Sequence, residues 1–505
     1  MDRPLLDLPG KSWDRDPAQE HWGKPLDMAF LRDTAFSAAA SIATVGGRLL
    51  TTVLLTHTLP QASYGQFVYL QWVIEISTLV CAFGLPGVMT RFLPQLSAAA
   101  DLFQARLLRW LAWATAGALI LTVAAFTAYV QFDREFGDLN ILLLALWCLS
   151  ATGLAFLSAA LQGLFRYDAS TVGNIAFAAV SLALILAWRT ELTVSTAALA
   201  MTMGYAAGII SAGLMLVLRK NNDKAADETL APAPRSILVY AGSIWITALI
   251  SSLVWSRGEF AILRIETTAA EIALYSAALT LTGAITQAAN LLTGALMPHL
   301  ARRWAQGAHD ELRAILNGTA MATLASTSLM AIGLIGLGDY VIGPLFSAKY
   351  LAAYPVLCVL AIAATAISSG AANAVLQIET DGTFAVKSNI LGLVVLFGLS
   401  FAFTPLMGIM GTAIARACSQ AAVGIYSMYR LRDMTTLKAD STRQLRAFLA
   451  ALSVLLAFYA LVRIMPDAVL IRIVLAGMFA PLALYAIQRA MGISIREFLR
   501  LRGAA

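Results

Sequence analysis

Five ionisable residues lie inside long apolar stretches of the sequence or directly after one: Arg48, Glu75 and Arg416 lie inside, and Arg257 and Glu259 follow the end of a stretch. A charge is costly in such surroundings, so these residues are candidates for function. The planar guanidinium of arginine pairs well with phosphate oxygens. The three arginines are therefore candidates for binding an anionic group, and the two glutamates for coupling to H+ or Na+.

Each of these residues also has a structural interpretation. Arg48 and Glu75 lie on adjacent predicted helices, where they would form a salt bridge. Arg48 follows two glycines and lies well inside its stretch, at about 22 Å along a helix and still within the hydrocarbon of a bilayer. Arg257 and Glu259 lie at the end of a stretch, from which a long arginine side chain reaches the membrane interface.

The composition indicates that these residues lie in a membrane protein. Hydrophobic residues make up 59% of the 505 residues and charged residues only 13%, against about a quarter in soluble proteins. The net charge of +6 is not gathered into one basic run, so no nucleic-acid partner is expected. The sequence predicts an all-α polytopic membrane protein.

A spanning helix needs about 20 mainly apolar residues, and 14 stretches meet this requirement. They cover residues 33–56, 65–86, 109–131, 140–163, 170–188, 195–218, 236–256, 271–296, 315–337, 354–378, 386–405, 408–430, 445–463 and 467–488.

The positions of the basic residues predict the orientation. With the N-terminus inside, cytoplasmic segments hold 26 of the 35 Lys and Arg residues, and external segments hold seven. Positive charge is enriched on the cytoplasmic side of membrane proteins. Both termini are therefore predicted to be cytoplasmic.

The chain also repeats itself weakly. Leu161-Gln162 is followed by Asn174-Ile175 in the first half of the chain, and Leu376-Gln377 by Asn389-Ile390 at the same spacing in the second half. Each repeat would hold six helices, and an even number gives both repeats the same orientation in the membrane. We expect two parallel six-helix repeats around a central cavity, with two further helices at the C-terminal end.

This organisation predicts six segments. They are a cytoplasmic N-terminal tail (1–32), an N-terminal six-helix bundle (33–218), a cytoplasmic linker (219–235), a C-terminal six-helix bundle (236–430), helices 13 and 14 (431–488) and a cytoplasmic tail (489–505).

Enzymatic chemistry has little support in the sequence. The four histidines are scattered, the four cysteines show no CxxC spacing, and no nucleophile–base motif appears. The predicted external connections are short, whereas membrane polymerases and ligases need room there for an active site. We expect a transporter with no metal and no cofactor.

Six short motifs carry a family resemblance. They are Ser63–Phe67, Phe83–Gly87, Arg91–Leu93, Glu271–Tyr275, Ile342–Phe346 with Tyr350, and Pro405–Ala415. With these motifs the chain resembles the polysaccharide-biosynthesis flippases, which handle O-antigen and exopolysaccharide precursors and belong to the multidrug/oligosaccharidyl-lipid/polysaccharide exporter superfamily. The resemblance covers residues 33 to about 430.

The resemblance implies transport of undecaprenyl-diphosphate-linked oligosaccharide repeat units across the bacterial inner membrane. The sugar would pass through the cavity while the lipid tail stays in the bilayer. Arg48 and Arg257, with Arg416, would hold the diphosphate, and Glu75 and Glu259 would couple transport to H+ or Na+. Membrane lipid and the polysaccharide polymerase and co-polymerase proteins are the implied partners.

Three alternatives remain open. One is a lipid II flippase or a drug/cation antiporter of the same superfamily. The lipid II flippase would share the count of 14 helices, whereas helices 13 and 14 argue against the antiporter, which also favours an acidic cavity. A membrane glycosyltransferase or polysaccharide polymerase is the alternative of another class. A major-facilitator-type porter lacks support, because its glycine–aspartate–arginine signature is missing between the second and third predicted helices.

Overall fold

The computed structural model describes most of the helical part of the chain. The described residues are 46–96, 140–164, 166–218, 234–293, 309–380, 383–433, 438–465 and 468–492, with residues 116, 117, 120, 124 and 300 between them. The predicted tails, nearly all of the linker, the start of the first predicted span and nearly all of the span 109–131 lie outside these residues.

All regular elements among the described residues are helical, which confirms the predicted fold class. In the first half these are the helix 46–58, α2 (Gln61–Ala82), α3 (Leu85–Leu96), α5 (Ile141–Gly163), α6 (Tyr167–Ala187) and α7 (Val194–Leu218). The second half begins with α8 (Pro234–Ser252), η3 (Leu253–Arg257), α9 (Phe260–Glu266), α10 (Ala269–Thr293) and α12 (His309–Phe346). It continues with η4 (Ala348–Ala353), α13 (Tyr354–Ala364), η5 (Thr365–Ser369), α14 (Gly370–Glu379), α15 (Thr383–Met407) and α16 (Ile409–Asp433), and α17 (Lys438–Ile464) and α18 (Val469–Met491) end the fold.

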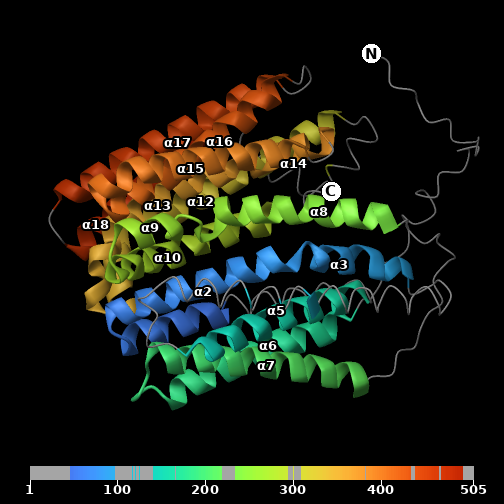
Figure 1. Ribbon diagram of the computed structural model, residues 1–505. Helices are drawn as coiled ribbons and strands as arrows, with labels where there is room; N and C mark the ends of the chain where they lie inside the picture. The colour runs from blue at the N-terminus through green and yellow to red at the C-terminus, as the bar shows by residue number, and fades with distance from the viewer. Residues whose placement is uncertain are drawn as a thin grey trace, which may run out of the picture.

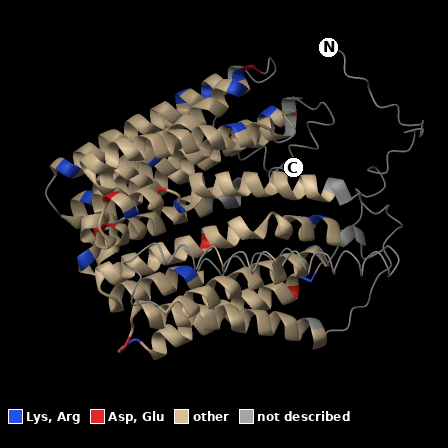
Figure 2. Ribbon diagram, in the orientation of Figure 1, with Lys and Arg blue, Asp and Glu red and all other residues tan. Residues whose placement is uncertain are grey.

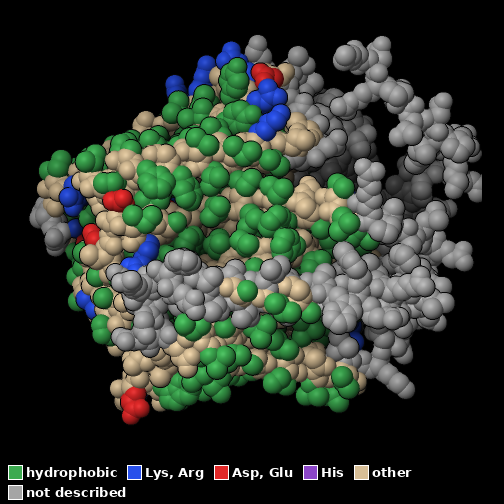
Figure 3. Space-filling view, viewed as in Figure 1, with side chains coloured by type: hydrophobic (Ala, Val, Ile, Leu, Met, Phe, Trp, Pro, Cys, Tyr) green, Lys and Arg blue, Asp and Glu red, His purple; other side chains and the backbone are tan. Residues whose placement is uncertain are grey.

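The helices run side by side along one common direction (Figure 1). Within the described residues, 11 helical segments are long and apolar enough to cross a membrane. Figure 2 shows charged residues mainly towards the ends of the helices, and Figure 3 shows hydrophobic side chains over much of the surface between those ends. This distribution is that of a multi-pass membrane protein, whose middle faces lipid.

Several predicted spans have different boundaries in the structure. The span 315–337 is part of the 38-residue helix α12, which is about 57 Å long and therefore extends well beyond the hydrocarbon core. The span 354–378 is divided into α13, η5 and α14. Helix α2 ends before Phe83 and Gly84, whose φ angles of 46° and 70° place both residues in the left-handed region.

The order of the helices supports the predicted repeat. Four helices of the second half follow one another along the chain at nearly the same spacing as four helices of the first half. In chain order, they are α10, α13, α15 and α16, which correspond to α2, α5, α6 and α7. The corresponding pairs α6–α7 and α15–α16 are each packed together as antiparallel neighbours. The last two helices, α17 and α18, pack on α12 of the second half. Arg472 of α18 forms a 2.5 Å ion pair with Asp339 of α12.

The two halves meet along α2 and α10, which are equivalent helices of the repeat. At the end where both helices begin, external in the predicted orientation, Gln61 Nε2 donates to the carbonyl oxygen of Ala270 at 3.2 Å. One turn further, a Cβ atom on Gly65 would lie 1.7 Å from the carbonyl oxygen of Ala269. Only glycine allows the two backbones to come this close.

Gly65→Ala should therefore disrupt the contact between the halves. The added methyl group forces α2 away from α10, and such overpacking costs about 1–3 kcal/mol. We expect a lower thermal unfolding temperature of the purified protein in detergent. Gly283→Ala is the matched control, because Gly283 lies in α10 and a Cβ atom added there would have nothing within 4 Å. An equal effect of the two substitutions would contradict this account of the interface.

Candidate functional site

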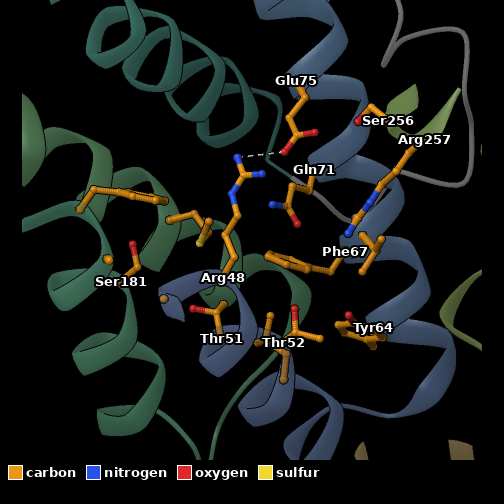
Figure 4. Close-up of a pocket in the computed structure, with 16 residues that line it drawn as sticks. Arg48, Thr51, Thr52, Tyr64, Phe67, Gln71, Glu75, Ser181, Ser256 and Arg257 are labelled. Atoms are coloured by element: carbon orange, nitrogen blue, oxygen red, sulfur yellow. Dashed lines mark ion pairs between the residues drawn. The ribbon is translucent and has the colours of Figure 1, made fainter. Parts of the chain in front are cut away.

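A small cavity lies where both halves contribute residues (Figure 4). Its volume is about 90 Å³, which is room for about three water molecules. The first half supplies most of the wall and η3 of the second half closes it. The lining comes from the helix 46–58 (Gly47, Arg48, Thr51, Thr52, Leu55), α2 (Tyr64, Phe67, Val68, Gln71, Glu75), α6 (Phe177, Ala178, Ser181), α7 (Met201) and η3 (Ser256, Arg257).

Arg48 owes its position to the glycine before it. A Cβ atom on Gly47 would lie 2.8 Å from the Cβ of Ala178 in α6, so the helix 46–58 packs closely against α6 at this level. The side chain of Arg48 then extends towards α2 and into the cavity (Figure 4). Gly47 therefore packs against α6 and also lines the cavity, whereas a Cβ atom on Gly46 would have nothing within 4 Å.

Arg48 and Glu75 form an ion pair of 3.4 Å between Nη2 and a carboxylate oxygen. Their side chains are 53% and 32% exposed, so the pair is not sealed in the protein interior. A guanidinium has five N–H donors, and a single contact with Glu75 leaves donors for another acceptor. The predicted salt bridge is present, and it lies inside the candidate binding cavity.

Arg257 reaches the cavity from the second half. It ends the π-helix η3 and its side chain extends towards the space beside Phe67 (Figure 4). Its guanidinium carbon lies 5.6 Å from the centre of the Phe260 ring, and no carboxylate among the described residues pairs with it. The cavity therefore holds two arginines and one glutamate, with the second arginine on the opposite bundle.

The rest of the lining is neutral and was not predicted. Thr51, Thr52, Gln71, Ser181 and Ser256 supply hydroxyl and amide groups, and Tyr64, Phe67 and Phe177 supply aromatic faces. Gln71 was the available signal in the sequence, as a lone polar side chain in the apolar run of α2. The small hydroxyl residues provided none, because serine and threonine are common at packed helix faces in membranes.

Arg416 and Glu259, both predicted at the site, lie elsewhere and pair with each other. Arg416 Nη1 lies 2.5 Å from Glu259 Oε1, and the hydroxyl of Tyr275 donates to the same oxygen at 2.9 Å. Glu259 is fully buried and Arg416 is 7% exposed. Neither residue lines the cavity. The structure thus brings Arg48, Glu75 and Arg257 together, and places Arg416 and Glu259 in a network inside the second half.

The described residues also include no group of three or more His, Cys, Asp or Glu residues that could hold a metal ion. The ionisable groups of the cavity are two arginines and one glutamate, and they lie where the two halves of the chain meet.

Comparisons with known structures identify the fold. The chain is similar to lipid II flippase MurJ in an inward closed conformation, with a TM-score of 0.64 and 12% identity over 90% of this chain and 99% of that one. It is also similar to an inward-facing multidrug resistance MATE family transporter of the MOP superfamily, with a TM-score of 0.60 and 15% identity over 80% of this chain and 99% of that one. An outward-facing MATE family transporter gives a TM-score of 0.54 and 15% identity over 81% and 96%. The chain has the fold of the MOP-superfamily transporters.

The sequence identifies the family of the chain. Residues 30–304 match the family described as polysaccharide biosynthesis protein, which is more than half of the chain. The chain belongs to this family, and the predicted resemblance is confirmed. Comparison with curated proteins finds no match.

The buried pair leads to a prediction about stability. Arg416→Met should lower the free energy of unfolding by about 3–5 kcal/mol, because it leaves the buried Glu259 carboxylate without its partner. Arg430→Met on the same helix is the control, since Arg430 pairs with Asp433 at the surface, where the two side chains are 44% and 50% exposed. An exposed pair contributes about 0–1 kcal/mol. The free energy of unfolding of both variants, measured in detergent, tests this difference. Equal losses of stability in the two variants would show that the Arg416–Glu259 pair is not sealed from water.

Proposed function

We propose that this protein is a flippase that moves undecaprenyl-diphosphate-linked oligosaccharide repeat units across the bacterial inner membrane for polysaccharide biosynthesis. One observation carries the proposal: Arg48 and Arg257, from opposite bundles, line one cavity at the interface between the halves. Two guanidinium groups suit the oxygens of a diphosphate. The family and the transporter fold support a lipid-linked substrate.

The neutral lining suits the sugar part of such a substrate. Hydroxyl and amide groups beside aromatic rings offer hydrogen bonds and flat apolar faces to a carbohydrate. The lipid chain has no place in so polar a space and stays in the bilayer. The protein therefore acts as a carrier for the head group, with no chemical reaction and no cofactor.

The volume of the cavity supports a mechanism of alternating access. About 90 Å³ does not hold an oligosaccharide, so the two bundles must move apart before the head group enters. Since one wall belongs to each half, a rocking motion opens and closes the site between the arginines. The substrate is then exposed to one side of the membrane at a time.

The charges also distinguish the alternatives. A cationic drug would meet two arginines and one glutamate in this cavity, which disfavours a drug/cation antiporter. A lipid II flippase carries the same diphosphate and is the second candidate, because the fold is similar to that of MurJ. The two differ in the sugar, so the oligosaccharide decides between them. A glycosyltransferase or polymerase would need catalytic groups that the cavity does not supply.

Binding of undecaprenyl diphosphate, with and without an attached oligosaccharide, tests the proposal. Arg48→Ala and Arg257→Ala should each weaken binding about tenfold or more, since a charge-assisted hydrogen bond contributes about 1.5–3 kcal/mol. Arg264→Ala is the matched control, because Arg264 lies in α9 over the ring of Tyr69 and not in the cavity. Arg48→Glu should abolish polysaccharide export in cells while the protein remains folded in the membrane.

Three results would contradict the proposal. One is binding of small organic cations with no binding of either lipid, which would assign the protein to the antiporters. Another is an equal loss of affinity in Arg264→Ala. A third is normal export by Arg48→Glu, which would remove this arginine from the mechanism.

Glu75 is the proposed coupling group. An anionic diphosphate on Arg48 lies beside the Glu75 carboxylate, and like charges at short distance favour neutralisation of one of them. Uptake of H+ or Na+ by Glu75 would then accompany binding of the substrate. A polysaccharide polymerase and co-polymerase are proposed as partners because of the proposed role in polysaccharide biosynthesis. No surface of the molecule is used to argue for them.

Glu75→Gln should uncouple transport from the ion gradient, because the amide cannot take up a proton and binds Na+ more weakly. Flipping of the lipid-linked oligosaccharide in proteoliposomes, measured with and without an imposed H+ or Na+ gradient, checks this expectation. Glu271→Gln is a control at a carboxylate outside the cavity, where Glu271 caps the start of α10 by accepting from the backbone N–H of Thr268. A full gradient response in Glu75→Gln would exclude Glu75 as the coupling group.

A further inference from the structure

The π-helix η3 is the element that presents Arg257 and Ser256 to the cavity. It joins α8 to the short helix α9 through Gly258 and Glu259. A π-helical turn is wider than an α-helical turn, is rare, and is often found at functional sites. Because this turn is intrinsically unfavourable, other parts of the structure must hold it in place.

Glycine at position 258 is the first requirement. A Cβ atom there would lie 2.0 Å from the carbonyl oxygen of Leu253, at the other end of the same turn. The turn therefore closes only where this residue has no side chain. Gly258 allows the shape but does not determine the direction in which Arg257 extends.

Arg416 supplies the second requirement. Its Nη2 donates to the backbone carbonyl oxygen of Trp255 at 3.0 Å, inside the π-helix. Its Nη1 donates to Glu259, directly after the turn. The indole Nε1 of Trp255 donates to Asn389 Oδ1 at 2.8 Å. The turn is thus held on both sides of Arg257 by α15 and α16 of its own bundle.

We infer that Arg416 is a positioning residue, which fixes the direction of Arg257 through Trp255 and Glu259 and so sets the affinity for the diphosphate without contacting it. This inference rests on the proposed function and assigns part of its specificity to a buried network. It differs from the role expected from sequence, in which Arg416 is itself a ligand. For that role Arg416 would have to leave Glu259 buried and unpaired.

A double-mutant cycle on the full-length protein separates the two roles. The first change is Glu259→Gln with Arg416→Gln, which removes both charges together and leaves neither one unpaired. The second is Arg257→Ala. Binding of undecaprenyl diphosphate is measured for the wild type, for each change and for the combination, and thermal unfolding of each protein confirms that it is folded.

If Arg416 acts through Arg257, the paired change should weaken binding about tenfold in the wild-type background and less than about twofold in the Arg257→Ala background, because groups that act through one another are not additive. An equal loss in both backgrounds would show a direct ligand and overturn the inference. Unchanged binding in both would show a purely structural pair and would also overturn it.

Arg416→Lys is a second variant in case the paired change does not fold. Lysine keeps a positive charge beside Glu259 but lacks the second branch of the guanidinium fork, which reaches Trp255. Arg416→Lys should therefore weaken binding of undecaprenyl diphosphate in the wild-type background and weaken it much less in the Arg257→Ala background. Wild-type affinity with Arg416→Lys would overturn the role of the Trp255 contact.

A readout without substrate separates this inference from the proposed function. Arg257→Cys is combined with Cys418→Ser, which removes the exposed cysteine, while Cys81, Cys148 and Cys358 are buried. The thiol introduced by Arg257→Cys should react severalfold faster or slower with a water-soluble thiol reagent when Arg416 and Glu259 are both replaced by Gln. An unchanged rate would overturn the positioning role, whereas absence of lipid binding in the wild type alone would overturn only the proposed function.

Discussion

In a bilayer a guanidinium group must be paired or hydrated within the protein, and this constraint divides the intramembrane arginines of the chain into two kinds. Arg416 is sealed inside one bundle, where it donates to Glu259 and to the backbone carbonyl oxygen of Trp255, while the hydroxyl of Tyr275 donates to Glu259. Arg48 faces a cavity, has a side chain that is more than half exposed and, among the described residues, contacts one carboxylate, that of Glu75. The first kind holds the structure in place, and the second remains free to exchange its partner for a ligand.

The length and composition of the apolar stretches were sufficient to predict the helices, because a membrane leaves few alternatives for a long uncharged apolar run. Their ends were less predictable. α12 continues past residue 337 to Phe346, since nothing in the sequence stops a helix where the hydrocarbon ends. The break at Phe83 and Gly84 was visible only as a Gly-Pro-rich motif, and its left-handed geometry depends on the fold.

Part of the candidate site could also be predicted from the sequence. Arg48, Glu75 and Arg257 all line one cavity, although the sequence placed Arg257 at the end of its apolar stretch. Arg416 does not reach the cavity, because the face of α16 that carries Arg416 packs against its own bundle, where the Trp255 carbonyl oxygen and Glu259 bind the guanidinium. The pairing with Glu259 joins residues 157 positions apart, and only the packing of α16 against the turn after η3 reveals it.

Close packing at glycine residues occurs within the first bundle as well as between the halves. Inside the first bundle, a Cβ on Gly204 would lie 1.9 Å from Ser181 Oγ, and one on Gly208 would lie 2.8 Å from the carbonyl oxygen of Gly173, so α6 and α7 touch along their length.

Between the halves, contacts lie on either side of the cavity along α2. At one level Lys349 Nζ donates to the carbonyl oxygen of Leu59 at 2.5 Å and the rings of Tyr64 and Tyr350 meet edge to face. At the other, Trp245 Nε1 donates to the carbonyl oxygen of Leu79 at 3.1 Å. The cavity lies between these levels, and its α2 lining begins at Tyr64 and continues to Glu75. Trp72, which follows the lining residue Gln71 in α2, also meets the Phe260 ring of the second half, with ring centroids 6.4 Å apart. The halves are therefore in contact at the level of the cavity as well as on both sides of it, and any separation of the halves has to break all of these contacts.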